Sequence, residues 1–261
     1  MSAAGRRSAW TEERGSEATG RRGKAEHEAA RGANQLIGVG VGPGDPELLT
    51  LKAVRVLSTA GRVFVPVLDP ADTGRAEATL AAHVPDERIE RLVFSLAGGS
   101  RERYWAAAGA RVAGWLRDTG GTAAFATIGD PHLYSTFGYL AGAVRELLPG
   151  VSVATVPGIT AMQALAAASG VPLAEGRERL VLLPLHGGVD GLGEVLASGA
   201  TTVVYKGYRH LPEIASAASA AGRDALYGTH LGLPDERTGP LSTLDGEAPY
   251  LSTVLIPARR A

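Results

Sequence analysis

The chain has 261 residues, of which 45% are hydrophobic, and its formal net charge is −1 at pH 7. This length allows one large domain or two small ones with a sizeable core. The balanced charge disfavours nucleic acid as a partner, and the absence of cysteine excludes disulfides, thiol nucleophiles and cysteine-based metal sites. The six histidines lack metal-binding spacings, so no metal is expected. No segment is typical of a membrane span or signal peptide, which predicts a cytoplasmic protein without a membrane partner.

Residues 1–34 differ in composition from the rest of the chain. They are rich in Ser, Gly, Arg and Glu and show no apolar periodicity, which predicts a disordered tail. The glutamates offset the arginines, so a solvated tail is favoured over a nucleic-acid-binding arm. We expect an N-terminal α/β domain over 35–156 and a C-terminal α/β domain over 157–261.

Strands and helices alternate in the first predicted domain. The predicted strands are Leu36–Val41, Val63–Val67, Arg88–Phe94, Thr122–Thr127 and Val151–Val156. The predicted helices are Pro46–Thr59, Arg75–His83, Arg101–Asp118 and Ser135–Leu148. In the first helix the periodicity places three residues on the buried side, namely Leu48, Leu51 and Val54. In the third helix it places there Trp105, Ala108, Val112 and Trp115. This alternation predicts a mainly parallel sheet with helices on both faces.

A hinge at Pro157 and Gly158 precedes a different pattern. Helices are predicted at Thr160–Ser169, Gly191–Ala197 and Leu211–Ala221. Strands are predicted at Leu180–Leu185, Thr201–Lys206, Asp224–Leu231 and Tyr250–Pro257, with Arg237–Ala248 as a connecting loop. Consecutive strands without an intervening helix predict a mixed, partly antiparallel second sheet. The expected fold is therefore α/β, with two domains and a cleft between them.

The segment Gly38–Thr50 contains the first glycine-rich loop and predicts a strand, a tight turn and a helix. Asp45 is a good N-cap, and Pro46 suits the first helical position. No register of this segment matches G-x-G-x-x-G, so a nicotinamide dehydrogenase is disfavoured. A purely structural turn remains an alternative.

Two further Gly/Pro loops, Thr127–Gly138 and Val156–Ala161, also follow strands and precede helices. Either loop alone is compatible with an ordinary turn, and Thr160 is compatible with a simple N-cap. Three such loops after three strands of one parallel sheet lie at one edge of it. This common position predicts a ligand cleft.

In order and separation, these three loops resemble those of the tetrapyrrole methylases, and the resemblance extends from Leu36 to Pro257. It implies S-adenosylmethionine as cofactor, S-adenosylhomocysteine as product, a small-molecule tetrapyrrole substrate and a homodimer. Residues 127–137 most resemble the branch that methylates precorrin-2 at C-20 to give precorrin-3A in cobalamin biosynthesis. A cobalt-precorrin-2 methylase or another corrin-pathway methylase remains open. So does a different class, either a non-catalytic nucleotide-binding module or a nucleotide-dependent oxidoreductase.

The resemblance also implies which residues contact the cofactor. These are Pro43, Ile128, Gly129, Asp130, Ser135, Thr136, Thr160, Ala161, Leu183, Tyr205 and Lys206, with Ser252 on a weaker alignment. The family usually has a large residue, often Met, where this chain has Tyr205 and Lys206.

Two roles depend on the chemistry that the resemblance implies. The methylated carbon must lose a proton, and His132 and Tyr134, beside the Gly-Asp loop, are candidates to assist; simple packing or capping is the alternative for His132. The substrate carboxylates require basic partners. Candidates near the ends of predicted elements are Arg75, Arg101, Arg103, Lys206 and Arg209.

Overall fold

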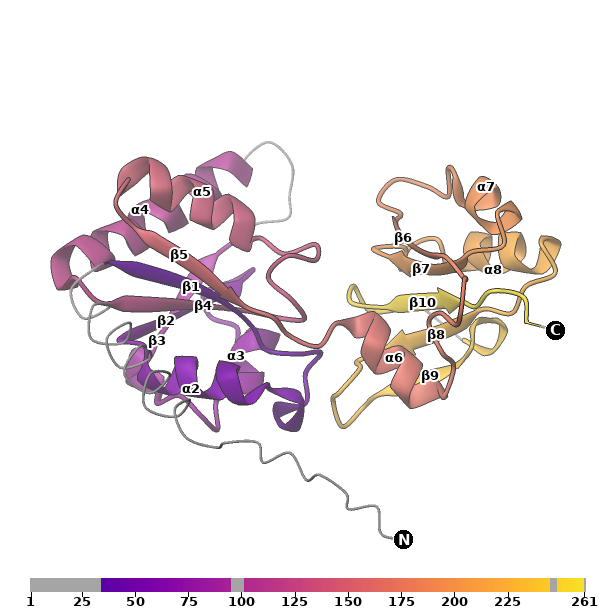
Figure 1. Ribbon diagram of the computed structural model, residues 1–261, viewed down its shortest axis with the longest axis horizontal. Coiled ribbons are helices and arrows are strands. Elements are labelled where there is room, and N and C mark those ends of the chain that lie inside the picture. Colours follow the sequence, from indigo (N-terminus) through magenta and orange to yellow (C-terminus); the bar gives the residue numbers. More distant parts are fainter. Residues whose placement is uncertain (1–33, 95–100, 245–247, 261) are drawn as a thin grey trace, which may run out of the picture.

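The computed structural model describes residues 34–94, 101–244 and 248–260, which form two lobes side by side (Figure 1). Each lobe is built on a five-stranded sheet. The predicted tail, apart from Asn34, and residues 245–247 of the predicted loop Arg237–Ala248 lie outside the described residues. The division into two domains at Pro157 stays a prediction.

The first sheet has the strand order β3-β2-β4-β1-β5. Its strands are β1 (Gln35–Gly40), β2 (Arg62–Val67), β3 (Ile89–Val93), β4 (Thr122–Thr127) and β5 (Ser152–Val156). All of their pairings are parallel, which confirms the predicted sheet. Because β1 lies between β4 and β5, the loops after these three strands are neighbours at the carboxyl edge.

Helices cover both faces of the first sheet (Figure 1). On one face α4 (Arg101–Thr119) and α5 (Phe137–Leu147) pack on Phe64 and Phe125. On the other face α2 (Leu51–Thr59) and α3 (Arg75–Leu80) cover the alternate strand residues. Both faces are therefore buried, which explains the continuous apolar character of these strands.

The predicted helix Pro46–Thr59 is wrong in its first turn. Residues 46–48 form a short 3₁₀ helix, η1 (Pro46–Leu48), and Thr50 then caps α2, its Oγ1 accepting a hydrogen bond from Ala53 N at 3.1 Å. This second start changes the phase of the helix, so Leu51, expected to be buried, is 90% exposed. The buried side is instead formed by Ala53 and Leu57.

The second sheet has the order β6-β7-β10-β8-β9. Its strands are β6 (Leu180–Pro184), β7 (Thr201–Tyr205), β8 (Leu226–Thr229), β9 (Arg237–Pro240) and β10 (Thr253–Ile256). Strands β6 and β7 are parallel and the other pairs are antiparallel, which confirms the predicted mixed sheet. The structure corrects the predicted loop Arg237–Ala248, because its first four residues form β9.

Helices also cover both faces of the second sheet, with α6 (Ala161–Ser169) on one side and α7 (Leu192–Ala197) and α8 (Leu211–Ala220) on the other. Two short 3₁₀ turns complete the described elements, η2 (Asp86–Arg88) and η3 (Leu241–Thr243). Within the described ranges, no helix is both long and apolar enough to cross a membrane.

A buried arginine ties together the ends of several elements in the second lobe. Arg223 is only 7% exposed. Its guanidinium and Nε donate hydrogen bonds of 2.9–3.1 Å to three backbone carbonyls. These carbonyls belong to Leu196 in α7, Ala200 before β7 and Pro257 after β10. The charge is thus satisfied by backbone acceptors rather than by a carboxylate.

Candidate functional site

The three glycine-rich loops touch through bare backbone. Gly129 N donates a hydrogen bond to Gly42 O at 2.7 Å, and Gly129 has a φ of +68°, in the left-handed region. A Cβ on Gly158 would lie 2.1 Å from Gly129 O, and one on Gly40 would lie 2.6 Å from Gly158 N. Glycine is therefore required for this approach.

Asp130 joins the loop after β4 to the loop after β5. Its Oδ1 accepts a hydrogen bond from His132 N at 2.8 Å, and its Oδ2 accepts one from Gly158 N at 3.1 Å. Nearby, Ser135 Oγ accepts a hydrogen bond from Phe137 N at 3.1 Å, so α5 begins at Phe137 rather than at Ser135. Both polar side chains thus hold the loops in shape.

A cavity of about 540 Å³ lies against these loops, with walls from both lobes. Of the residues expected at the cofactor, the cavity is lined by Pro43, Ile128, Gly129, Asp130, Ser135, Thr136, Thr160, Ala161, Tyr205, Lys206 and Ser252. Leu183 does not line it but packs against the core beneath α7 and α8. The walls that sequence reasoning missed include Leu68, Asp72, Phe94, Leu231, Tyr250 and Leu251.

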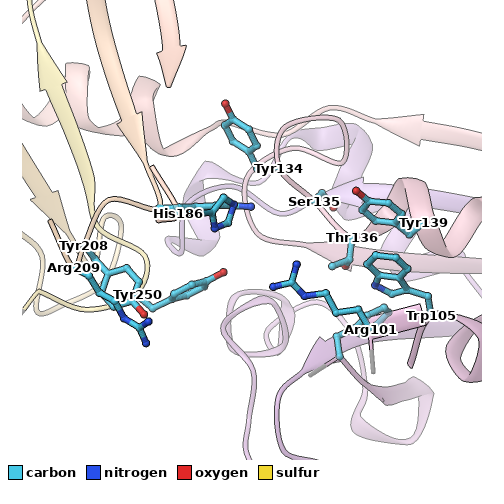
Figure 2. Close-up of a pocket in the computed structure, with 12 residues that line it drawn as sticks. Arg101, Trp105, Tyr134, Ser135, Thr136, Tyr139, His186, Tyr208, Arg209 and Tyr250 are labelled. Atoms are coloured by element: carbon cyan, nitrogen blue, oxygen red, sulfur yellow. The ribbon is translucent and has the colours of Figure 1, made fainter. Parts of the chain in front are cut away.

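A second cavity of about 880 Å³ adjoins the first. Its lining is aromatic and basic: Phe94, Arg101, Trp105, Tyr134, Ser135, Thr136, Tyr139, His186, Lys206, Tyr208, Arg209 and Tyr250. Figure 2 shows Arg101 and Tyr250 directed toward the same space from opposite lobes. No carboxylate is among these lining residues. Three of the predicted basic candidates line this cavity; Arg75 lines the smaller one, and Arg103 lines neither.

Aromatic side chains give the larger cavity a flat wall. The rings of Trp105 and Tyr139 are stacked, with centroids 4.1 Å apart and planes 3° apart. The sequence placed Trp105 on the buried face of its helix, and it is in fact half-buried, at the cavity wall. In the sequence, this role is indicated only by the aromatic residues near the starts of α4 and α5.

Six residues line both cavities and define their junction, namely Phe94, Tyr134, Ser135, Thr136, Lys206 and Tyr250. Tyr134 and Lys206 have φ values of 53° and 60°, in the left-handed region that side chains usually avoid. Lys206 Nζ lies 5.3 Å from the centroid of the Tyr134 ring. That ring lies 5.2 Å from the ring of Tyr205, so the lobes meet at the junction through these side chains.

Burial shifts the titration of the groups around the junction. Burial, and then the charge of Arg101, lower the pKa of Lys206. Burial, Lys206 and Arg101 lower the pKa of His186. Burial raises the pKa of Tyr134 and of Tyr250, so both phenols stay protonated at neutral pH. The phenols of Tyr134 and Tyr250 therefore add no negative charge to the cavity walls.

The structure separates the two residues expected to assist proton loss. Tyr134 is at the junction of the cavities, whereas His132 lines neither of them. The His132 Nε2 atom instead lies 3.1 Å from Thr155 Oγ1 on β5. This contact matches the packing alternative for His132.

Comparisons of sequence show two similar relatives. The "Probable cobalt-precorrin-2 C(20)-methyltransferase" of Methanocaldococcus jannaschii is 41% identical over 152 residues, which are 58% of this chain and 64% of that protein. The "Precorrin-2 C(20)-methyltransferase" of Sinorhizobium sp is 32% identical over 240 residues, 87% of this chain and 96% of that protein. The chain thus matches less than two thirds of the archaeal relative and nearly all of the bacterial one.

Solved structures share the fold. Cobalt precorrin-4 methyltransferase (CbiF) superposes with a TM-score of 0.67 at 21% identity, covering 86% of this chain and 95% of that one. Uroporphyrin-III C-methyl transferase from Thermus thermophilus, complexed with S-adenosylhomocysteine, has a TM-score of 0.60 at 26% identity, covering 85% and 96%. The family model for "Tetrapyrrole (Corrin/Porphyrin) Methylases" matches residues 35–245, which include the first lobe and most of the second. The chain belongs to the tetrapyrrole methylase family.

Proposed function

We propose that the chain is an S-adenosylmethionine-dependent methyltransferase that methylates precorrin-2 at C-20, giving precorrin-3A in cobalamin biosynthesis. One observation carries this proposal: a cavity against the glycine loops and a basic, aromatic cavity share a wall. Two ligands held in these cavities would meet at that wall. The names of the relatives from Sinorhizobium and Methanocaldococcus support the position of methylation.

The smaller cavity fits S-adenosylmethionine in size and lining. Its volume of about 540 Å³ is in the usual range for small-molecule sites. Apolar residues such as Leu133 and Leu231 suit the adenine, while Thr136 and Asp72 offer polar partners to the ribose and amino-acid groups. When bound, the cofactor supplies an electrophilic methyl group on a sulfonium centre. The S-adenosylhomocysteine complex of the Thermus relative supports this choice of ligand.

The larger cavity fits an anionic tetrapyrrole. Arg101 and Arg209 supply positive charge for propionate and acetate side chains. The stacked pair of Trp105 and Tyr139 offers a flat apolar surface to the ring system. No carboxylate on this wall opposes such a substrate.

The chain's contribution to the reaction is mainly placement. Holding two reactants in an oriented contact is worth about 7–11 kcal/mol of the barrier. Asp130 keeps the loops after β4 and β5 in a fixed relation, and the left-handed Tyr134 and Lys206 close the junction from both lobes.

The second candidate function is methylation of a cobalt-containing precorrin-2. The relative with 41% identity is named for cobalt-precorrin-2, which favours a cobalt-containing substrate as the alternative. The proposal also includes a homodimer in the cytoplasm, which the family resemblance supports.

The deciding experiment is incubation of the purified protein with S-adenosylmethionine and metal-free precorrin-2 without oxygen, followed by mass spectrometry and NMR. One added methyl at C-20 is expected. Transfer only to cobalt-precorrin-2, in a parallel reaction, would move the enzyme to the cobalt route. Transfer to neither substrate, despite tight binding of S-adenosylhomocysteine, would contradict the proposed substrate.

A further inference from the structure

The junction of the two cavities restricts which side chains can act on the reacting carbon. This inference rests on the proposed function, because methyl transfer requires the two ligands to touch, and they can touch only where the cavities share a wall. Among the six residues of that wall, three carry titratable groups: Tyr134, Lys206 and Tyr250. Burial raises the pKa of both phenols and lowers that of Lys206, so Lys206 is the group on the shared wall whose pKa is shifted toward the form that accepts a proton.

Lysine is a rare choice in this chain. It occurs only at Lys24, Lys52 and Lys206, and arginine carries the positive charge elsewhere. A site that needed only to bind carboxylates would be served better by arginine, whose planar guanidinium pairs with them in a bidentate way. A guanidinium does not release its proton in proteins, whereas a lysine amine does so when it is partly buried. Lysine at the junction thus adds a capacity that arginine lacks.

The surroundings of Lys206 favour its neutral amine. Burial, and then repulsion by Arg101 on α4, lower its pKa. Burial, and then the charges of Lys206 and Arg101, lower the pKa of His186 after β6. The tyrosines of these walls with a raised pKa are Tyr134, Tyr205 and Tyr250, and Tyr139 and Tyr208 also line the larger cavity. Arg209 adds a further cation to the larger cavity, while the acids Asp72 and Asp130 line the smaller cavity only.

The backbone holds Lys206 in place at some energetic cost. Its φ of 60° lies in the left-handed region that residues other than glycine usually avoid. Such strain persists where the surrounding structure requires it, often at functional sites. Here the conformation accompanies the amine's position 5.3 Å from the centre of the Tyr134 ring, on the opposite lobe.

We propose that Lys206 Nζ accepts the proton that the tetrapyrrole carbon loses after methylation. When the new carbon–carbon bond forms, the bond between sulfur and the methyl group breaks, and its electron pair stays on sulfur. The methylated carbon then carries both the methyl group and its original hydrogen. The lone pair of Nζ takes this hydrogen as a proton, and the electrons of the carbon–hydrogen bond restore the conjugation of the ring. The amine becomes an ammonium ion and releases its proton to water before the next turnover.

Two substitutions separate a proton acceptor from a carboxylate anchor. Lys206→Arg can still pair with a carboxylate but cannot accept a proton, so we expect KM within about twofold of wild type and kcat lower by about 100-fold. Lys206→Met should lose kcat to a similar extent. Lys52→Arg, on the exposed side of α2, is the matched control and should leave both constants unchanged. If Lys206→Arg keeps the wild-type kcat while Lys206→Met mainly raises KM, Lys206 is an anchor and the proposal is wrong.

An isotope measurement detects proton loss directly. With precorrin-2 deuterated at C-20, turnover of Lys206→Arg should slow further, because loss of the proton has become rate-limiting. Added methylamine should partly restore turnover of Lys206→Ala. An isotope effect equal to that of wild type, together with no rescue by the amine, would overturn the proposal.

A third readout needs neither substrate nor turnover. Reductive methylation of the free wild-type protein at a series of pH values, read by peptide mass spectrometry, compares Lys206 with Lys52 in one sample. The midpoint for Lys206 should lie at lower pH, because burial and Arg101 lower its pKa. Equal midpoints would count against the inference. If the midpoints differ but the wild type methylates no tetrapyrrole, the proposed function is wrong although the pKa of Lys206 is lowered.

Discussion

Gly158 shows how strongly single residues constrain this site. A methyl group there would lie 2.1 Å from Gly129 O and 2.8 Å from Gly40 Cα, and backbone cannot move aside as a side chain can. We expect Gly158→Ala to lower the free energy of unfolding by about 1–3 kcal/mol. It should also weaken S-adenosylhomocysteine binding, measured by calorimetry.

The matched control is Gly142→Ala on α5, where a Cβ meets nothing within 4 Å. Replacing a helical glycine should raise the free energy of unfolding by about 0.5–1 kcal/mol. Chemical denaturation of both variants gives the comparison. Equal free energies of unfolding for Gly158→Ala and Gly142→Ala would show that the loop backbones move apart at little cost.

Arg223 tests the role of a buried charge held by carbonyls. Arg223→Met fills similar space but leaves the carbonyls of Leu196, Ala200 and Pro257 without their donor. We expect a loss of about 2–4 kcal/mol in the free energy of unfolding by urea titration. Arg55→Met, on the exposed side of α2, should change it by less than about 0.5 kcal/mol. A similar result for both variants would show that water replaces the guanidinium.

Residue chemistry was predictable where its partners are close in sequence. Asp45 caps η1 and Pro46 begins it, as expected, because both effects act within one turn. The role of Asp130 in joining two loops was not predictable, since its partner Gly158 is 28 residues away. The pattern also could not show that Thr50 begins a second helix, because both Asp45 and Thr50 are good caps.

At the scale of elements, Tyr205 links the end of β7 to the start of α6. Its hydroxyl accepts a hydrogen bond from Met162 N at 3.2 Å, so it satisfies one of the free amides of the first helical turn. Tyr205→Phe should lower the free energy of unfolding by about 1 kcal/mol. Hydrogen exchange at Met162 should become faster, measured by NMR or mass spectrometry.

The control for Tyr205→Phe is Tyr227→Phe in β8 of the same sheet, a buried ring whose hydroxyl has no hydrogen bond within the described part of the chain. It should leave the exchange of Met162 unchanged. Unchanged exchange in Tyr205→Phe as well would show that the amide is protected in another way.

Elements with a strong period were predictable, and a short one was not. The apolar strands of the first lobe and its long helices α4 and α5 were predicted with nearly correct boundaries, whereas the helices predicted at Pro46–Thr59 and Arg75–His83 were too long. The strand β9 was missed because Arg237–Pro240 contains Gly and Pro and lies at the sheet edge, where half of its backbone groups need no partner. Its pairing with β8 is a tertiary effect that a local pattern does not carry.

At the scale of the molecule, the lobes meet where Gly232 packs on Asp45. Gly232 has a φ of +76°, and a Cβ there would lie 2.7 Å from Asp45 N. We expect Gly232→Ala to push the lobes apart and raise the Kd for S-adenosylhomocysteine by about tenfold, equivalent to about 1.4 kcal/mol. Circular dichroism should show both sheets intact.

Gly191→Ala is the control for this substitution, because Gly191 has a φ of +77° but no atom within 4 Å of the added Cβ. It carries the same backbone strain without the contact between the lobes. Comparable weakening of binding in both variants would attribute the effect to strain alone.

The sequence predicted the cleft but only part of its walls. Three loops at one sheet edge were enough to predict a cavity there, because strand direction alone brings them together. The walls from residues 68–76 and 250–253 depend on β2 lying beside β4 and on how the second lobe faces the first. Neither follows from the local pattern, since strand order and lobe orientation are set by long-range packing.

The position of Trp105 at the wall of the larger cavity, where it stacks on Tyr139, has an optical consequence. The chain has tryptophan at positions 10, 105 and 115; Trp115 packs edge-on against Phe64 within the first lobe, whereas Trp105 faces the larger cavity. Conjugated tetrapyrroles absorb in the region where indole emits, so a tetrapyrrole bound in the larger cavity would quench the emission of Trp105 by energy transfer. The tryptophan fluorescence of the protein would therefore fall as the tetrapyrrole binds, so binding could be followed without an added dye.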